Sequence, residues 1–283
     1  MAVFRALQTA AGATRRNLVL FAVAAAYGLV QIPQLAAQAF QPMLAGVVSL
    51  AMSALLVFVL PFYFAGIIGM ANEAIDGRTS LDTLIDAGKR YYVSVFVVYL
   101  LIFGVSFVLG VVAFLVAIVG VGAGLGAAQS GGGTGGAVLV AGLVVAVIGL
   151  LYLVVVFFTQ FFGHAIVVDD LGAVDGLKRS VGAVRDNLLA TLGYTILVAV
   201  VGGLFGVFGA LFGLLTSAGL GGQTAPAAPS AATTPTAALP SVGLAGVAAL
   251  LVVYVVGAGV FGGFFAAYST AFYREIRPDA SLV

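Results

Sequence analysis

The sequence predicts an all-α membrane protein: a polytopic bundle of six transmembrane helices in three elbow-plus-hairpin repeats, with both termini in the cytoplasm. Of the 283 residues, 63% are hydrophobic and 7% are charged, whereas soluble domains are about half apolar and about one quarter charged. The 11 basic and 10 acidic residues gather in four short clusters. All of the basic residues fall on one predicted side of the membrane, so the composition and its pattern exclude a soluble enzyme and a disordered protein.

Two further classes are excluded by charge and by cysteine content. A formal net charge of +1 gives no basic field, so we expect no nucleic-acid partner. The chain has no cysteine, which excludes disulfides, thiolate catalysis and cysteine-ligated metals. We expect no metal and no cofactor.

The predicted spans follow from three charge-free stretches: 17–72, 91–168 and 187–273. A helix needs about 20 apolar residues to cross roughly 30 Å of hydrocarbon, so each stretch can hold two crossings and a turn. The six predicted spans are 18–37, 44–71, 92–118, 138–163, 188–215 and 243–271.

The orientation follows from the turns inside these stretches. The turns lie at 38–42, at the glycine-rich run 129–136, and at the Pro/Ala/Thr/Ser run 216–241, which we expect to be a disordered outer loop. None of them carries Lys or Arg. By the positive-inside rule the opposite side is cytoplasmic, which predicts a multi-pass protein of the cell membrane with both termini inside.

An internal repeat divides the single predicted membrane domain, 1–283, into the pseudo-repeats 1–72, 73–168 and 169–275. Six residues recur identically 170 positions later: Leu7, Gly12, Ala13, Arg15, Asn17 and Leu18 match Leu177, Gly182, Ala183, Arg185, Asn187 and Leu188. Residues 80–92, ending in Lys89-Arg90 and a span, give a weaker third copy. A cleaved signal peptide is the competing interpretation of the N-terminus, but the repeat makes residues 1–17 part of the fold.

Each repeat begins with a predicted amphipathic elbow, best formed at 174–186. Val174, Leu177, Val181 and Val184 recur at helical spacing and predict one apolar stripe lying in the headgroup plane. Thr79 or Ser80 would cap the middle elbow, and Asp169-Asp170 is interpreted as a helix N-cap. The basic residues expected to contact lipid or a partner are Arg15, Arg16, Lys89, Arg90, Lys178, Arg179 and Arg185.

The run from Gly172 to Ser180, followed by Arg185-Asp186-Asn187-Leu188 and Gly193, resembles the cytoplasmic loop of uncharacterised six-span membrane families. One is an archaeal, mainly haloarchaeal, family of unknown function. The more distant one is the membrane domain attached to some bacterial glycerophosphodiester phosphodiesterases. The resemblance implies the fold and supplies no assigned chemistry, and the phosphodiesterase activity does not carry over.

Few residues in the predicted spans could carry chemistry. No ionisable acid or base lies at mid-membrane, which argues against an ion-coupled transporter. The single histidine, His164, could serve a metal or pH-sensitive site, but an interfacial histidine hydrogen-bonded to an elbow is the favoured interpretation. Residues that could line a polar path are Tyr27, Tyr99, Tyr194, Gln160 and His164.

Glycines form two bare helix faces. Gly202, Gly206, Gly209 and Gly213 share one face, and Gly259 and Gly263 share another. Small residues allow helices to approach closely, so these faces predict packing within the bundle or a homodimer.

The leading prediction of function is a non-enzymatic structural or interaction protein, whose cytoplasmic elbows contact the lipid bilayer or a membrane-protein partner. The alternative is an uncoupled transporter or permease-like protein for a small or lipophilic solute, since transporters often contain repeats. An enzyme ranks third, because it would need His164 within reach of two acidic groups.

Overall fold

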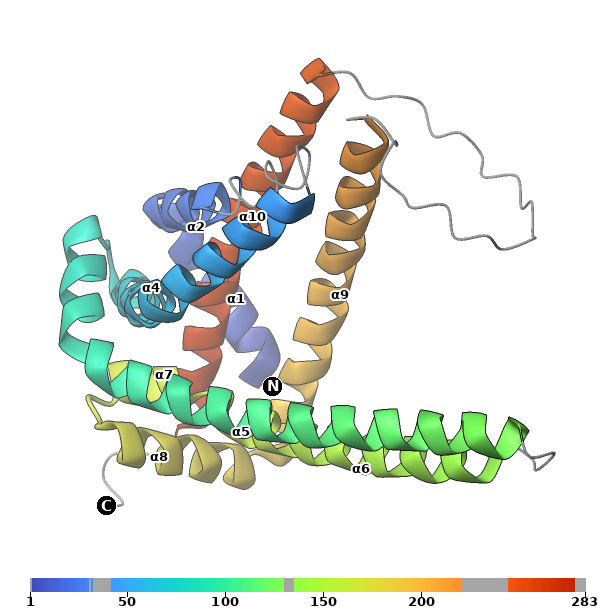
Figure 1. The fold of residues 1–283 in the computed structure, drawn as a ribbon. Coiled ribbons are helices and arrows are strands. Elements are labelled where there is room, and N and C mark those ends of the chain that lie inside the picture. The colour runs from blue at the N-terminus through green and yellow to red at the C-terminus, as the bar shows by residue number, and fades with distance from the viewer. Residues whose placement is uncertain (1, 31, 33–41, 130–134, 220–243, 278–283) are drawn as a thin grey trace. The chain divides into compact units, whose positions relative to one another are not determined.

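The computed structural model describes residues 2–30, 32, 42–129, 135–219 and 244–277 (Figure 1). These residues form helices and no strand, which confirms the all-α class. The helices are α1 (Ala2–Arg16), α2 (Val19–Val30), α4 (Pro42–Asp76), α5 (Leu81–Gln129), α6 (Gly135–Thr159), α7 (Phe162–Val168), α8 (Ala173–Asp186), α9 (Leu188–Gly219) and α10 (Leu244–Ile276).

Several of these helices can cross a membrane. Within the described chain, four stretches are long and apolar enough: Gly46–Asp76, Leu81–Ala127, Gly136–Val168 and Leu251–Ile276. The bent pair Ala173–Asp186 plus Leu188–Leu204 would give a fifth. At 12 residues α2 is shorter than a crossing, and most of the remainder of the predicted span 18–37 lies outside the described residues. Six spans therefore stay a prediction.

The elbow at 174–186 is a separate helix, α8, which ends at Asp186 before α9 begins at Leu188. The helix breaks at Asn187, whose backbone N–H donates to the Val184 carbonyl at 3.2 Å. The junction between α1 and α2 is built in the same way, because the Asn17 N–H donates to the Thr14 carbonyl at 3.2 Å.

The middle elbow differs from this pattern. Residues 81–92 continue into the predicted span, so that α5 is one unbroken helix, although its first turns run in a different direction from the rest (Figure 1). Ser80 accepts the N–H of Thr83 at 3.5 Å at the beginning of α5 and is the residue that caps it.

The predicted turns fall mostly outside the described residues. Of the run 216–241, residues 216–219 belong to α9 and so are helical rather than loop, and 220–241 are not described. Of the run 129–136, Gln129 ends α5 and Gly135 begins α6, with 130–134 not described. In the first turn, only Pro42, where α4 begins, is described.

The helices group into two compact units that are discontinuous in sequence. The first comprises Met1–Leu60, Met70–Thr83 and Leu189–Glu275, and the second comprises Pro61–Gly69, Leu84–Leu188 and Ile276–Val283. The second unit has a core made by Ala65, Ile68, Val95, Val98, Ile166 and Val167. In the first unit, Tyr194 of α9 stacks on Phe272 and Tyr268 of α10, with ring centroids 4.5 and 5.3 Å away.

Candidate membrane-surface site

Asn17 joins the α1–α2 junction to the end of α4. Its side chain is 4% exposed. The amide nitrogen donates to the carbonyl oxygens of Ala13 at 2.9 Å and Gly77 at 3.0 Å, with a longer approach of 3.4 Å to Ala74. The amide oxygen accepts the backbone N–H of Thr79 at 2.9 Å. Both functions of the amide are thus used to hold the elbow against the turn after α4.

Asn187 occupies the corresponding place between α8 and α9. Its side-chain amide donates to the Ala183 carbonyl at 3.1 Å and to the Ile276 carbonyl, at the end of α10, at 2.9 Å. Like Asn17, it bonds the carbonyl four residues earlier and a carbonyl at the end of a long helix. These bonds supply donors to carbonyls that a helix end leaves without intrahelical partners.

The two elbow helices also bury the same positions. Ala6, Ala10, Ala13 and Thr14 are the buried residues of α1, and Gly176, Ser180, Ala183 and Val184 are those of α8. Each member of the second set lies 170 residues after a member of the first. Small side chains dominate both sets, which lets each elbow helix approach its neighbours closely. In α8, for example, Ser180 Oγ donates to the Phe158 carbonyl at 3.0 Å and accepts the Phe161 N–H at 3.2 Å.

Arg90 and Tyr91 occupy this place in the middle of the chain. Arg90 Nη2 lies 2.6 Å from Asp170 Oδ2, and Tyr91 also hydrogen-bonds the Asp170 side chain. Asp170 follows α7 and has a positive φ of 55°, a left-handed conformation that aspartate tolerates better than most residues. The end of α7 is therefore held by the beginning of α5.

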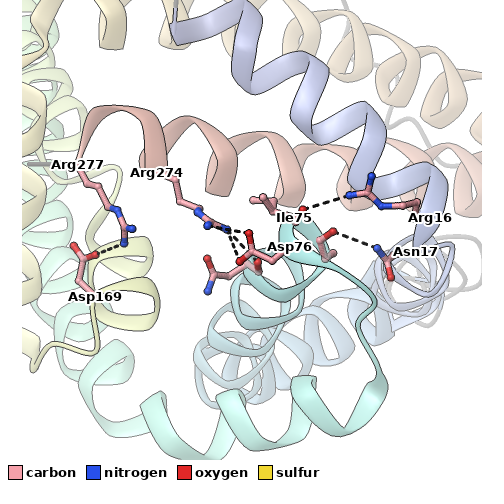
Figure 2. A network of polar contacts seen from close by, with 9 residues as sticks. Arg16, Asn17, Ile75, Asp76, Asp169, Arg274 and Arg277 are labelled. Carbon is pink, nitrogen blue, oxygen red and sulfur yellow. Dashed lines mark hydrogen bonds and ion pairs between the residues drawn. The ribbon is translucent and has the colours of Figure 1, made fainter. Parts of the chain in front are cut away.

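Asp169 links two further cations at the end of α7. Its side chain is 11% exposed, and one of its oxygens lies 3.2 Å from Arg179 Nε. The other lies 3.0 Å from Arg277 Nη1 (Figure 2). Its interpretation as an N-cap is wrong, because Asp169 is the C-cap of α7 and the N-cap of α8 is Gly172. A carboxylate is unfavourable at a helix C-terminus, and here two arginines offset it.

Two other ion pairs tie the end of α10 to α4 and α1. Arg274 makes a bidentate pair with Asp76, both distances being 3.0 Å (Figure 2). Arg5 Nη2 lies 2.9 Å from Glu275. Both ion pairs, Arg274 with Asp76 and Arg5 with Glu275, lie within the first compact unit.

The predicted lipid-contacting cations fall into two groups. Arg16, Arg90 and Arg179 bond to protein groups, since Arg16 donates to the Ile75 carbonyl at 3.3 Å and the other two have acidic partners. Lys178 is exposed and lies 4.0 Å from the equally exposed Asp175. Arg15, Lys89 and Arg185 are exposed and have no ion-pair partner among the described residues.

The outward face of α8 consists of Val174, Lys178, Val181 and Arg185, spaced by four, three and four residues. Val174 is 63% and Val181 37% exposed, and both basic residues are exposed as well. The predicted single stripe is therefore divided, because Leu177 packs against the core of the second unit and Val184 is buried. What remains outside is a face that mixes apolar and cationic groups.

The glycine faces have different surroundings. Gly259 and Gly263 of α10 lie against α2, where the nearest atoms belong to Phe21, Ala25 and Leu20. On α9, a Cβ added at Gly202, Gly206 or Gly209 would meet nothing within 4 Å. Gly213 also lies in α9.

The residues considered for a polar path do not line the groove between α5 and α6. An open groove of about 600 Å³ between α5 and α6, which run side by side (Figure 1), is lined by apolar residues such as Leu115, Val119 and Val140. Tyr27, Tyr99, Tyr194, Gln160 and His164 are not among its lining residues. Tyr194 is stacked on α10, and the Gln160 amide donates to the Phe157 carbonyl at 2.9 Å.

His164 is buried in α7 rather than placed at a surface. Its ring makes edge contacts with Phe161 and Phe64, at centroid distances of 5.8 and 6.4 Å. In the described part of the chain, no group of three or more His, Cys, Asp or Glu side chains could hold a metal ion.

The residues whose side chains bond the helix ends, Asn17, Asn187 and Asp169, were not predicted from the sequence to make these contacts. Asn17 and Asn187 appeared there only as repeat identities, and Asp169 and Arg277 had no assigned contact. The signal for the asparagines was present, because a polar residue repeated at the boundary of two spans needs hydrogen-bond partners.

Fold and site together define an all-α protein with several helices able to cross a membrane. Polar side chains, such as Asn17 and Asn187, join the ends of these helices to one another; we call these contacts the clasps. The chain belongs to the family described as Domain of unknown function (DUF7847), which matches residues 1–276. No curated protein and no solved structure matches the chain.

Proposed function

We propose that this protein is a non-enzymatic, multi-pass protein of the cell membrane, whose amphipathic elbows lie among the lipid headgroups of the cytoplasmic surface and clasp the ends of its spans. The observation that carries the proposal is the outward face of α8, where exposed valines share one side with exposed Lys178 and Arg185. This mixture is typical of helices that lie in the interface plane, because the valines enter the acyl boundary while the cations meet headgroups.

The proposal includes three repeats, six spans and cytoplasmic termini. In support, the end of each elbow bonds a residue at the end of, or just after, a later helix: Asn17 bonds Gly77 after α4, Arg90 bonds Asp170 after α7, and Asn187 bonds Ile276 at the end of α10. Each elbow also contacts the end of the helix that precedes it in cyclic order: Arg5 contacts Glu275 of α10, Thr83 contacts Glu73 of α4, and Arg179 contacts Asp169, which follows α7. Three equivalent sets of contacts favour three equivalent units.

The finer relationships stay predictions within this proposal. The likeness to archaeal six-span families rests on the motif at 172–193. The alternative of an uncoupled transporter gains no support from the contacts of Tyr194 and Gln160, which are engaged in packing and in a local hydrogen bond.

The experiment that tests the proposal measures the depth of α8 in a bilayer. Because the chain contains no cysteine, a nitroxide can be attached at a single introduced cysteine in the full-length protein reconstituted in vesicles. We expect the ratio of oxygen to nickel-complex accessibility at Val181→Cys to fall between that at Arg78→Cys, which follows α4, and that at Leu189→Cys, at the beginning of α9. A water-like ratio at position 181, equal to that at 78, would contradict the proposal.

A further inference from the structure

We infer that three cations at equivalent elbow positions, Arg15, Lys89 and Arg185, each bind the phosphate of one anionic phospholipid. The inference rests on the proposed position of the elbows at the membrane surface. It goes beyond that proposal in assigning one lipid to each repeat and in naming the residue that holds it.

The three positions are equivalent in sequence and in burial. Arg15 and Arg185 are 170 residues apart in the repeat, and Lys89 holds the same place in the weaker copy. Each cation is exposed and follows, by two residues, a buried alanine: Ala13, Ala87 and Ala183. Each elbow thus turns its alanine inward and its cation outward at the point where the span begins.

Neighbouring cations have partners within the protein, whereas these three have no ion-pair partner in the described part of the chain. Arg16 bonds to the Ile75 carbonyl, Arg90 to Asp170 and Arg179 to Asp169. For Arg15, Lys89 and Arg185, no acidic partner exists among the residues that the structure describes. An exposed cation at a membrane surface attracts anionic headgroups, so the partner comes from outside the chain.

The residues that follow each cation favour a lipid over free phosphate. Leu18, Val93 and Leu189 lie three or four residues after the three cations and are 67%, 69% and 86% exposed. A phospholipid joins an anionic phosphate to acyl chains, so it can satisfy the cation and cover the apolar side chain together. Inorganic phosphate offers only the charge.

The test counts lipids retained by the purified full-length protein in native mass spectrometry, with phosphatidylglycerol and phosphatidylcholine as probes. We expect wild type to retain up to three phosphatidylglycerol molecules in preference to phosphatidylcholine. Each single variant, Arg15→Gln, Lys89→Gln or Arg185→Gln, should lose one, with affinity at that position falling about fivefold. Excess inorganic phosphate should displace none of them, and displacement would overturn the assignment to a lipid.

Two control variants separate the outcomes. Arg15→Lys/Lys89→Arg/Arg185→Lys keeps the charges and should retain the lipids, whereas Arg78→Gln removes an exposed cation outside the elbows and should have no effect. Unchanged lipid retention in the triple glutamine variant, or loss of a lipid in the Arg78→Gln control, overturns the inference. If the nitroxide at 181 reports headgroup depth while retention is unchanged, the inference alone fails. If that nitroxide reports water, the proposed function fails as well.

Discussion

Asn17 holds two helix ends with one side chain. Carbonyls at the end of α4 and the N–H of Thr79 lie where the chain leaves the predicted membrane, and an unsatisfied backbone group in an apolar setting is costly. The amide of Asn17 supplies both a donor and an acceptor there. An aspartate could not donate, and a leucine could do neither.

We therefore predict that Asn17→Ala destabilises the protein by about 2–3 kcal/mol, because it leaves the Gly77 carbonyl and the Thr79 N–H without their partner. Asn187→Ala should cost less, since Asn187 makes fewer bonds and is less buried. Thermal unfolding of the detergent-solubilised protein, followed by circular dichroism, measures both. The control is Gln8→Ala, at an exposed position of α1. If Asn17→Ala were as stable as this control, the bonds of Asn17 would not contribute to stability.

The bridge formed by Asp169 gives a second expectation. Asp169→Asn should lower stability by about 1–2 kcal/mol, since Arg179 is largely buried and loses its counter-charge while Arg277 remains partly exposed. Asp170→Asn removes the more exposed pair with Arg90 and should cost less. The same unfolding measurement ranks the two variants, and the reverse order would show that Asp169 is not the main link.

At the scale of residues, sequence reasoning found where the polar positions are and not what they contact. The identity of Asn17 with Asn187 was visible, but their partners lie 57 to 89 residues away along the chain. His164 shows the same limit. One histidine beside two aspartates suits an interface, and only the fold reveals that its ring is enclosed by Phe161 and Phe64.

At the scale of elements, α8 was predicted almost to the residue, 174–186 against Ala173–Asp186. Which face of α8 is buried and which is exposed was not predicted. Periodicity shows which side chains lie together, but protein and lipid are both apolar surroundings, so it cannot tell which of them a valine meets. The buried face uses glycine, serine and alanine because close approach to α7 needs small residues.

The two glycine faces predict opposite signs for the same substitution. In Gly259→Ala the new Cβ would lie 2.8 Å from Ala25 Cβ and 2.9 Å from the Phe21 carbonyl oxygen, which should cost about 1–3 kcal/mol through overpacking. Gly206→Ala meets nothing within 4 Å and should gain up to about 1 kcal/mol from helix propensity. Melting temperatures of the two variants measure the difference, and a shift in the same direction for both would contradict the packing of α2 on α10.

For the molecule as a whole, the charge pattern predicted much of the architecture. Long charge-free stretches became α4, α5, α6 with α7, α9 and α10, because a membrane span excludes charge regardless of its neighbours. Unbroken helicity from Leu81 to Gln129 was not foreseen. At the middle elbow Arg90 and Tyr91 stand in the place that asparagine occupies at the two junctions where the helix ends.

The proposed topology makes a direct prediction for intact cells. Single cysteines at Arg78 and Gly172 should react with a membrane-impermeant maleimide only after permeabilisation, because both positions lie on the predicted cytoplasmic side. Cysteines at Thr134 and Gln223, in the predicted outer turns, should react without permeabilisation. Labelling at Arg78→Cys in unbroken cells would reverse or renumber the spans.

The clasps also impose an order on biosynthesis. Asn17 leaves the ribosome long before Gly77 and Thr79, so the first elbow cannot be locked until the second cluster of charges has been translated. Asn187 likewise waits for Ile276, which is translated 89 residues later. A nascent chain that has not yet reached Ile276 would carry its hydrophobic segments without the bond that holds the α8–α9 junction to the end of α10.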